Sequence, residues 1–194
     1  YDLVDHSSVS LSLILRGLNK FSNNFVAEQI LKTLAAELYG HPGTTENGLQ
    51  AMEKYLQSLG YASDQYQLLD ASGLSRQNRL SPDQIVSILQ DMYGDFGVYP
   101  EFVSALGAMG RDGNVQKRMN GHNGSDRARV KTGTLNSVST LSGYFQSADR
   151  ERFAFSILMN DLKCSTGRAW VLQDQIISEG LKFQREPRGV DPVK

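Results

Sequence analysis

The fold of this chain is set by the stretch Arg127-Ala128-Arg129-Val130-Lys131-Thr132-Gly133-Thr134. Polar and apolar residues alternate along it, which is the pattern of a half-buried β-strand. Two more runs of strand-forming residues follow at 140–146 and 153–160. The short polar link at 148–151 favours antiparallel pairing of these two runs. The sequence therefore predicts a small antiparallel sheet of three strands.

Helical periodicity dominates upstream of that sheet. Apolar residues recur at helical spacing over 11–18 and again over 26–38, with an interruption at 21–24. Gly40 and Pro42 end the second pattern. Because the interruption falls between two helices, the sequence predicts that the residues around Ser22 form a helix-to-helix joint.

Four more helical or irregular segments complete the expected secondary structure. A helix is expected over 49–59 with Thr45 as its N-cap, and another begins at Ser81, which precedes a proline. The glycine-rich segment 94–125 is irregular and is predicted to wrap the surface. A last helix over 166–183 closes the fold.

The predicted fold class is α+β. A C-terminal helix is expected on one face of the sheet and the helical cluster of residues 7–92 on the other. A length of 194 residues with 40% hydrophobic content is enough for one packed core. We interpret residues 1–183 as part of a single domain and residues 184–194, which contain two prolines, as a flexible tail.

Composition excludes several classes of function. With 20 basic and 21 acidic residues, the net charge of −1 offers no electrostatic footprint for nucleic acid. A lone Cys164 excludes an internal disulfide framework. The three histidines, His6, His41 and His122, share no metal-ligand spacing, so the sequence implies no metal and no cofactor.

Candidate catalytic residues come from two short motifs, Ser22-Asn23-Asn24 and Lys131-Thr132-Gly133. A serine hydroxyl in a helix joint can relay a proton to a leaving amine, and the Asn24 amide can orient a substrate backbone. If the two motifs meet in the fold, Lys131 can hold the Ser22 hydroxyl, and its charge can attract a terminal carboxylate. Each motif alone is also typical of ordinary structure, a helix cap for the first and a solvated strand end for the second.

The residues after Lys131 are suited to binding a peptide. Thr132 and Thr134 offer hydroxyl donors to a substrate carboxylate. Gly133 has no side chain, so a substrate peptide can lie against the strand and form backbone hydrogen bonds as an added strand. Since neighbouring strand residues point to opposite faces, we expect this strand to border the cleft with its edge.

Taken together, the two motifs resemble the Ser-x-Asn and Lys-Thr-Gly elements of penicillin-binding serine hydrolases. The third motif of that group, Ser-x-x-Lys, carries the nucleophile and does not occur in this sequence. The residues three positions before the lysines are Gly17, Gln29, Ala51, Asn114, Ala128, Asn160, Glu179 and Asp191. We therefore expect the chain to be a fragment of a larger enzyme, with the nucleophile in a missing N-terminal portion.

Longer segments are similar to the DacB-type D-alanyl-D-alanine carboxypeptidases of the peptidase S13 family. The stretch 21–28 resembles the Ser-x-Asn segment of that family, and 70–76 resembles its Asp-Gly-Ser-Gly-Leu-Ser-Arg loop, with Ala71 in place of the glycine. The segment from Gly110 to Arg118 and the stretch 131–144 also match, in the expected order. The resemblance implies that Arg76 meets the stem peptide. It also implies that the N–H of Thr134 forms half of an oxyanion hole.

The same resemblance implies a function and a location. The parent protein is expected to cleave peptidoglycan stem peptides through an acyl-enzyme, to be acylated by β-lactams, and to work in the periplasm or another extracytoplasmic space. One alternative is a catalytically inert module that binds peptidoglycan peptides. A β-lactamase is a weaker alternative, because the Glu-x-x-Leu-Asn pattern of the class A enzymes is absent from the sequence.

Overall fold

The structure, a computed structural model, describes residues 4, 7–119 and 121–185. Most of the tail predicted at 184–194 lies outside these residues. The helices are α1 (Leu11–Phe21), α2 (Asn24–Tyr39), α3 (Thr45–Ser58), α4 (Pro82–Gly94), α5 (Tyr99–Ala105) and α6 (Thr166–Lys182), with short 3-10 turns η1 (Gly113–Val115) and η2 (Ser125–Arg127). The strands are β1 (Gly107–Ala108), β2 (Ala128–Leu135), β3 (Val138–Gln146) and β4 (Arg152–Met159).

The sheet is antiparallel with the strand order β1-β2-β3-β4. Its three long strands confirm the predicted ones within two residues at each end. The prediction of three strands missed β1, whose two residues are too few for any periodicity to appear. Because β1 pairs only with Arg129 and Val130, β2 has no strand partner on its outer edge beyond Val130 in the described part of the chain.

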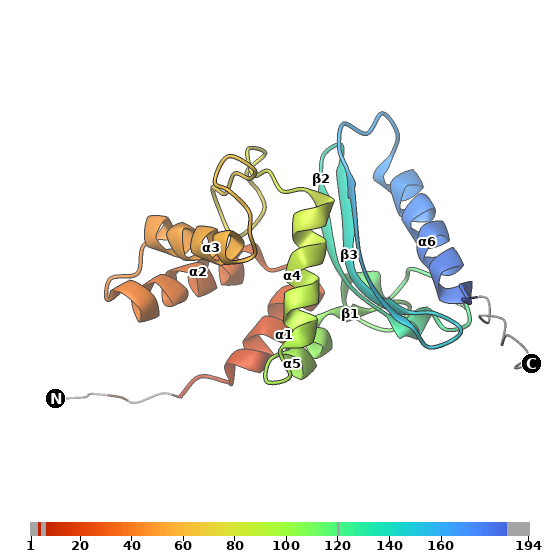
Figure 1. Ribbon diagram of the computed structural model, residues 1–194, viewed down its shortest axis with the longest axis horizontal. Coiled ribbons are helices and arrows are strands. Elements are labelled where there is room, and N and C mark those ends of the chain that lie inside the picture. The colour runs from red at the N-terminus through yellow and green to blue at the C-terminus, as the bar shows by residue number, and fades with distance from the viewer. Residues whose placement is uncertain (1–3, 5–6, 120, 186–194) are drawn as a thin grey trace, which may run out of the picture.

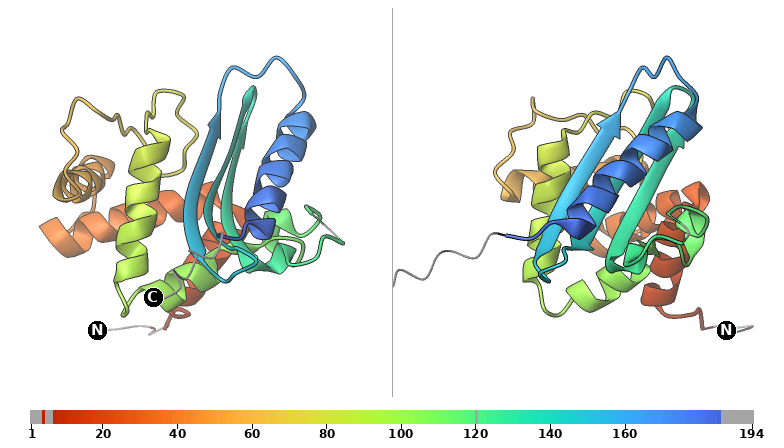
Figure 2. Two further views of the ribbon diagram at one scale, coloured as in Figure 1. Left: turned by 45° about the vertical axis from the view of Figure 1, so that its right-hand side comes forward. Right: turned by 90° about the vertical axis from the view of Figure 1, so that its right-hand side faces the viewer.

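Helices cover both faces of the sheet, as the sequence predicts. In Figures 1 and 2, α6 packs on one face, α4 crosses the other, and the pair α2 and α3 stands beyond α4. The core under α6 is formed by buried residues of the sheet, of α6 and of the segment that precedes β2: Met109, Val115, Met119, Ala128, Val130, Leu141, Ile177 and Leu181. On the opposite face, Tyr144 packs against Leu89 and Leu106. No helix among the described residues is long and apolar enough to cross a membrane.

The predicted surface course of segment 94–125 holds for its ends, 94–98 and 121–123, which are exposed, and is wrong for its middle. Met109 and Val115 are almost completely buried, and Met119 is also buried. The polar residues of this segment find partners in distant elements, so it can pass through the core in spite of its glycine content. Asp112, for example, forms an ion pair with the nearly buried Lys20 of α1.

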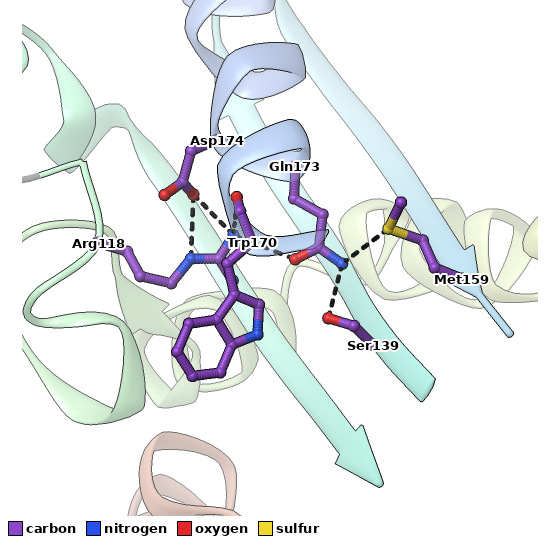
Figure 3. Close-up of polar contacts among 6 residues, drawn as sticks. All are labelled: Arg118, Ser139, Met159, Trp170, Gln173 and Asp174. Carbon is purple, nitrogen blue, oxygen red and sulfur yellow. Dashed lines mark hydrogen bonds and ion pairs between the residues drawn. The ribbon is translucent and has the colours of Figure 1, made fainter. Parts of the chain in front are cut away.

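A buried polar network ties this segment to α6 and the sheet (Figure 3). Arg118 donates to Asp174 at 2.7 and 3.0 Å and to the Gln173 side-chain oxygen at 3.1 Å. The amide nitrogen of Gln173 donates to the Ser139 hydroxyl at 3.1 Å and lies 3.7 Å from the sulfur of Met159. Gln173 and Ser139 are fully buried. The network therefore joins α6 to the start of β3, directly opposite Thr134 of β2.

Helix starts follow the expected capping chemistry. Ser81 caps α4 and forms a reciprocal capping box with Gln84. The cap of α3 is Thr44, one residue before the predicted Thr45, because the Thr44 hydroxyl accepts from the N–H of Asn47 at 3.2 Å.

Candidate active site

Ser22 lies in the predicted joint between α1 and α2. Its backbone is left-handed, with φ of 55°, so the chain turns sharply after the last residue of α1. The next residue, Asn23, caps α2 by accepting from the N–H of Val26 at 3.1 Å. The motif thus supplies both a helix cap, through Asn23, and two side chains beside the cap, those of Ser22 and Asn24, that line a cavity.

Lys131 of β2 reaches across the fold to this joint. Its ammonium nitrogen donates to the Ser22 hydroxyl and to the Thr132 carbonyl oxygen, each at 2.7 Å. The first bond joins residues 109 positions apart in the sequence. Burial lowers the pKa of Lys131 from its usual 10.5, because the charged form is poorly solvated there. A lysine in this state exchanges its proton with the neighbouring hydroxyl more readily than a solvated lysine does.

A cavity of about 440 Å³ lies beside this pair. Its walls come from the helix joint, the loop at 72–74, η1 and the two central strands. The lining residues are Phe21, Ser22, Asn24, Ser72, Gly73, Leu74, Asn114, Lys131, Thr132, Gly133, Thr134, Leu135, Val138 and Thr140.

Five consecutive residues of β2, 131–135, line this one cavity. Alternation would allow only every second residue to face a cleft that lies over one face of the sheet. The strand therefore borders the cavity with its unpaired edge, as expected from the sequence. Thr132 pairs with Leu141, which belongs to the core under α6, so the register puts the Thr132 side chain on the α6 face.

Gly133 lies close to the side chain of its cross-strand neighbour Thr140. A Cβ at this position would lie 2.5 Å from the Thr140 hydroxyl oxygen, which is closer than side chains tolerate. Because it has no side chain, Gly133 leaves the strand edge accessible to another backbone.

The loop opposite β2 is tightly ordered by Asp70. The Asp70 carboxylate accepts from the N–H groups of Gly73 and Ser75 at 2.6 Å and from the Asn78 amide at 2.9 Å. Burial acts to raise the pKa of Asp70, but these hydrogen bonds outweigh it and hold the pKa below its usual value. Ala71, which departs from the family's glycine, is not among the residues with positive φ, so alanine fits its backbone.

Arg76 does not line this cavity. Its guanidinium donates to the Asn136 carbonyl oxygen at 2.8 Å, in the turn between β2 and β3. Arg76 instead lines an adjoining cavity of about 490 Å³, which shares Gly73, Leu135, Val138 and Thr140 with the first. The structure thus brings Ser22, Lys131 and the residues around them together and leaves Arg76 at the neighbouring cavity.

Asn114 is a cavity residue that was missed from the sequence. It belongs to η1, which docks against the last turn of α1 through the ion pair between Lys20 and Asp112. Gly113 makes this approach possible, because a Cβ there would lie 2.7 Å from the Lys20 carbonyl oxygen. The available sequence signal for Asn114 was the resemblance of the segment from Gly110 to Arg118 to the family. No local pattern shows that η1 lies beside Ser22.

A metal site is not formed by the described residues. No three histidine, cysteine, aspartate or glutamate side chains gather there in a way that could hold an ion. Of the three histidines, His6 lies outside the described residues.

Sequence comparison relates the chain to D-Ala-D-Ala carboxypeptidases. The family model described as D-Ala-D-Ala carboxypeptidase 3 (S13) matches residues 1–177. A D-alanyl-D-alanine carboxypeptidase of Actinomadura sp. (strain R39) is 37% identical over 81% of the chain, and the D-alanyl-D-alanine carboxypeptidase DacB of Haemophilus influenzae is 28% identical over 88%. The chain spans only 30% and 37% of the lengths of these two relatives.

Structural comparison agrees with this. Penicillin binding protein 4 (dacB) from Haemophilus influenzae, in complex with a β-lactam, matches 92% of the chain with a TM-score of 0.80 and 27% identity. The match covers 43% of that protein. The TLA-1 β-lactamase matches with a TM-score of 0.60 at 17% identity, so that likeness concerns the fold alone. The α+β fold predicted from the sequence is therefore that of penicillin-binding and β-lactamase-like proteins.

Proposed function

Because the chain belongs to the D-Ala-D-Ala carboxypeptidase 3 (S13) family, we propose that it is the C-terminal part of a serine carboxypeptidase or endopeptidase acting on peptidoglycan. The proposed substrate is the stem peptide, which the enzyme cleaves through an acyl-enzyme, and β-lactams acylate the same site. The observation that carries the proposal is the 2.7 Å hydrogen bond between Lys131 and Ser22 at the edge of the cavity.

In this proposal, the nucleophilic serine lies in a Ser-x-x-Lys motif outside the 194 residues. Two features support the proposal that another portion of the same protein packs against this chain. A mainly apolar cavity of about 290 Å³ lies between α4, α5 and the sheet, with Lys131 and Ser142 among its lining residues. β4 is the last strand of the sheet, so its outer edge has no strand partner within the described part of the chain and can pair with another strand.

The residues have distinct roles in the proposed reaction. The stem peptide lies along the free edge of β2, and Asn24 orients its backbone. The nucleophilic serine passes its hydroxyl proton to the lysine of its own Ser-x-x-Lys motif as its oxygen attacks the carbonyl carbon of the scissile bond, and the N–H of Thr134 stabilises the oxyanion that forms. As the C–N bond breaks, the Ser22 hydroxyl passes a proton to the leaving amine and regains one from the lysine of the Ser-x-x-Lys motif, while Lys131 holds the Ser22 hydroxyl in place. Water then releases the acyl group from the nucleophile.

Two further roles concern the ends of the substrate. Lys131 carries positive charge next to Thr132 and Thr134, which suits the terminal carboxylate of a D-Ala-D-Ala peptide. Arg76 lies at the adjoining cavity, where it can meet a more distant part of the stem peptide. Since peptidoglycan is outside the cytoplasm, we propose a periplasmic or otherwise extracytoplasmic location.

The experiment that tests this function measures release of D-alanine from an acylated tripeptide ending in D-Ala-D-Ala. The intact protein that contains this chain is compared with its Lys131→Ala variant. We expect release by the intact protein and a loss of about 100-fold or more in the variant, the range typical of a lost transition-state donor. An inert peptide-binding module would bind the tripeptide and release no D-alanine from either protein.

A further inference from the structure

We infer that Glu28 is a positioning residue that sets the loop wall of the cavity against the Ser-x-Asn motif. The inference rests on the proposed function, and it concerns a residue for which the motifs assign no role. Glu28 lies on α2, one turn after Asn24.

The contact is a double hydrogen bond to backbone. One carboxylate oxygen of Glu28 accepts from the N–H of Ala71 at 3.0 Å and from the N–H of Ser72 at 2.8 Å. The side chain is half-buried. Hydrogen bonds from an N–H to a carboxylate are stronger than those between neutral groups, and two on one oxygen fix the direction of the chain as well as its distance.

These two N–H groups begin the segment that walls the cavity. Ser72 lines the cavity itself, and so do the next two residues, Gly73 and Leu74. Asp70 orders the loop internally, but all of its hydrogen bonds run to residues of the loop and its continuation up to Asn78. Among the described contacts, the two hydrogen bonds to Glu28 tie Ala71 and Ser72 to α2. Glu28 therefore fixes the position of the cavity wall relative to α2, whereas Asp70 orders the loop internally.

The placement of Glu28 on α2 couples this wall to the motif. Residues four apart on a helix lie on the same face, so Asn24 and Glu28 project in the same direction. The distance between the Asn24 amide and the loop is thus fixed through one rigid turn of helix. A substrate held between β2 and the loop requires that distance, because displacements of about 1 Å in a site can lower rates about 100-fold.

Two measurements test the inference, and the first does not depend on catalysis. Amide hydrogen exchange at Ala71 and Ser72 is compared in the intact protein that contains this chain and in its Glu28→Ala variant. We expect exchange at these two amides to accelerate about ten-fold or more, since a charge-assisted bond is lost at each. Exchange at the core residues Val130 and Leu141 is expected to stay unchanged, which separates a local effect from general destabilisation. Unchanged exchange at Ala71 and Ser72 would overturn the inference.

The second measurement is the rate of acylation by a penicillin in the intact protein. Glu28→Ala is expected to slow acylation about ten-fold or more. Glu28→Gln keeps an acceptor oxygen and is expected to recover most of the rate. Glu37→Ala removes an exposed glutamate near the other end of α2 and serves as the matched control.

The two readouts distinguish the possible failures. If the unaltered protein is not acylated at all, the proposed function fails, while hydrogen exchange still decides whether Glu28 holds the loop. If Glu28→Ala frees the two amides but acylation is as fast as in the unaltered protein, the positioning role is refuted and the proposed function stands.

Discussion

Replacement of Gln173 by leucine tests the buried network that holds α6 against the start of β3. Gln173 accepts from Arg118 and donates to Ser139, and both Gln173 and Ser139 are inaccessible to solvent. Leucine is close to glutamine in size but offers no polar atom. The Gln173→Leu variant therefore leaves the buried Ser139 hydroxyl without its donor, while Arg118 keeps Asp174 and the Trp170 carbonyl as partners.

The expected cost follows from these contacts. A buried polar group that loses its partner costs about 1–3 kcal/mol, and the loss of the hydrogen bond from Arg118 to Gln173 adds about 1 kcal/mol. We therefore expect the free energy of unfolding to fall by about 3 kcal/mol. For a protein of this size, such a loss lowers the melting temperature by roughly 6–12 °C. Urea denaturation followed by circular dichroism measures the free energy, and a thermal scan measures the temperature.

Two comparison variants sharpen this experiment. Gln175→Leu changes an exposed glutamine on the same helix and is expected to stay within about 0.5 kcal/mol of the unaltered protein. The double variant Gln173→Leu with Ser139→Ala replaces both partners, so its cost should fall short of the sum of the single costs by about 1 kcal/mol. If Gln173→Leu is no more costly than Gln175→Leu, the network does not stabilise the fold and the reasoning is refuted.

Three further predictions concern the site and the sheet. Burial lowers the pKa of Lys131 in the folded state below the 10.5 of the unfolded chain. The charged lysine therefore lowers the free energy of unfolding at pH values below its folded-state pKa. This penalty shrinks as pH rises above the folded-state pKa and is gone above 10.5. Lys131→Met should therefore be stabilising at neutral pH in urea denaturation, with an advantage that shrinks toward pH 10.5; an advantage independent of pH would contradict the assignment. Asp70 has the opposite sign: its lowered pKa contributes stability above pH 3.8 that is lost as pH falls through the lowered value, so the destabilisation caused by Asp70→Asn should vanish in acid. Gly143→Ala should destabilise the chain by about 2 kcal/mol or more, because the new Cβ would lie 2.1 Å from the Arg129 carbonyl oxygen; a normal urea midpoint would show that β2 and β3 can separate there at little cost.

Periodicity was sufficient to predict the regular elements that position the site. The long strands and the helices from α1 to α4 carry apolar residues at spacings of two or of three and four, and those spacings survive in the structure. The joint at Ser22 was predictable for the same reason, since it is a gap between two periodic segments. The two residues of β1 have no period, so local patterns could not find them.

No local sequence pattern could predict which distant residues lie close together in the fold. The bond between Ser22 and Lys131 spans 109 positions, and only the resemblance to a known family suggested that the two motifs meet. The burial of Met109, Val115 and Met119 depends on contacts of their segment with Lys20 and Asp174, which lie far away in sequence. Glycine content predicted a surface course there, and tertiary contacts overrode it. The same holds for Glu28, whose contact with the loop joins residues more than 40 positions apart.

Mass spectrometry of the intact protein before and after exposure to a penicillin tests the central claim most directly. The claim is that this chain supplies Ser22 and Lys131 to an acyl-transfer site whose nucleophile lies in a Ser-x-x-Lys motif outside the 194 residues. We expect a covalent penicilloyl adduct on a serine outside this chain, formed at least about 100-fold more slowly in the Lys131→Ala variant. The claim would be contradicted by the absence of any adduct, or by an adduct that forms equally fast without Lys131.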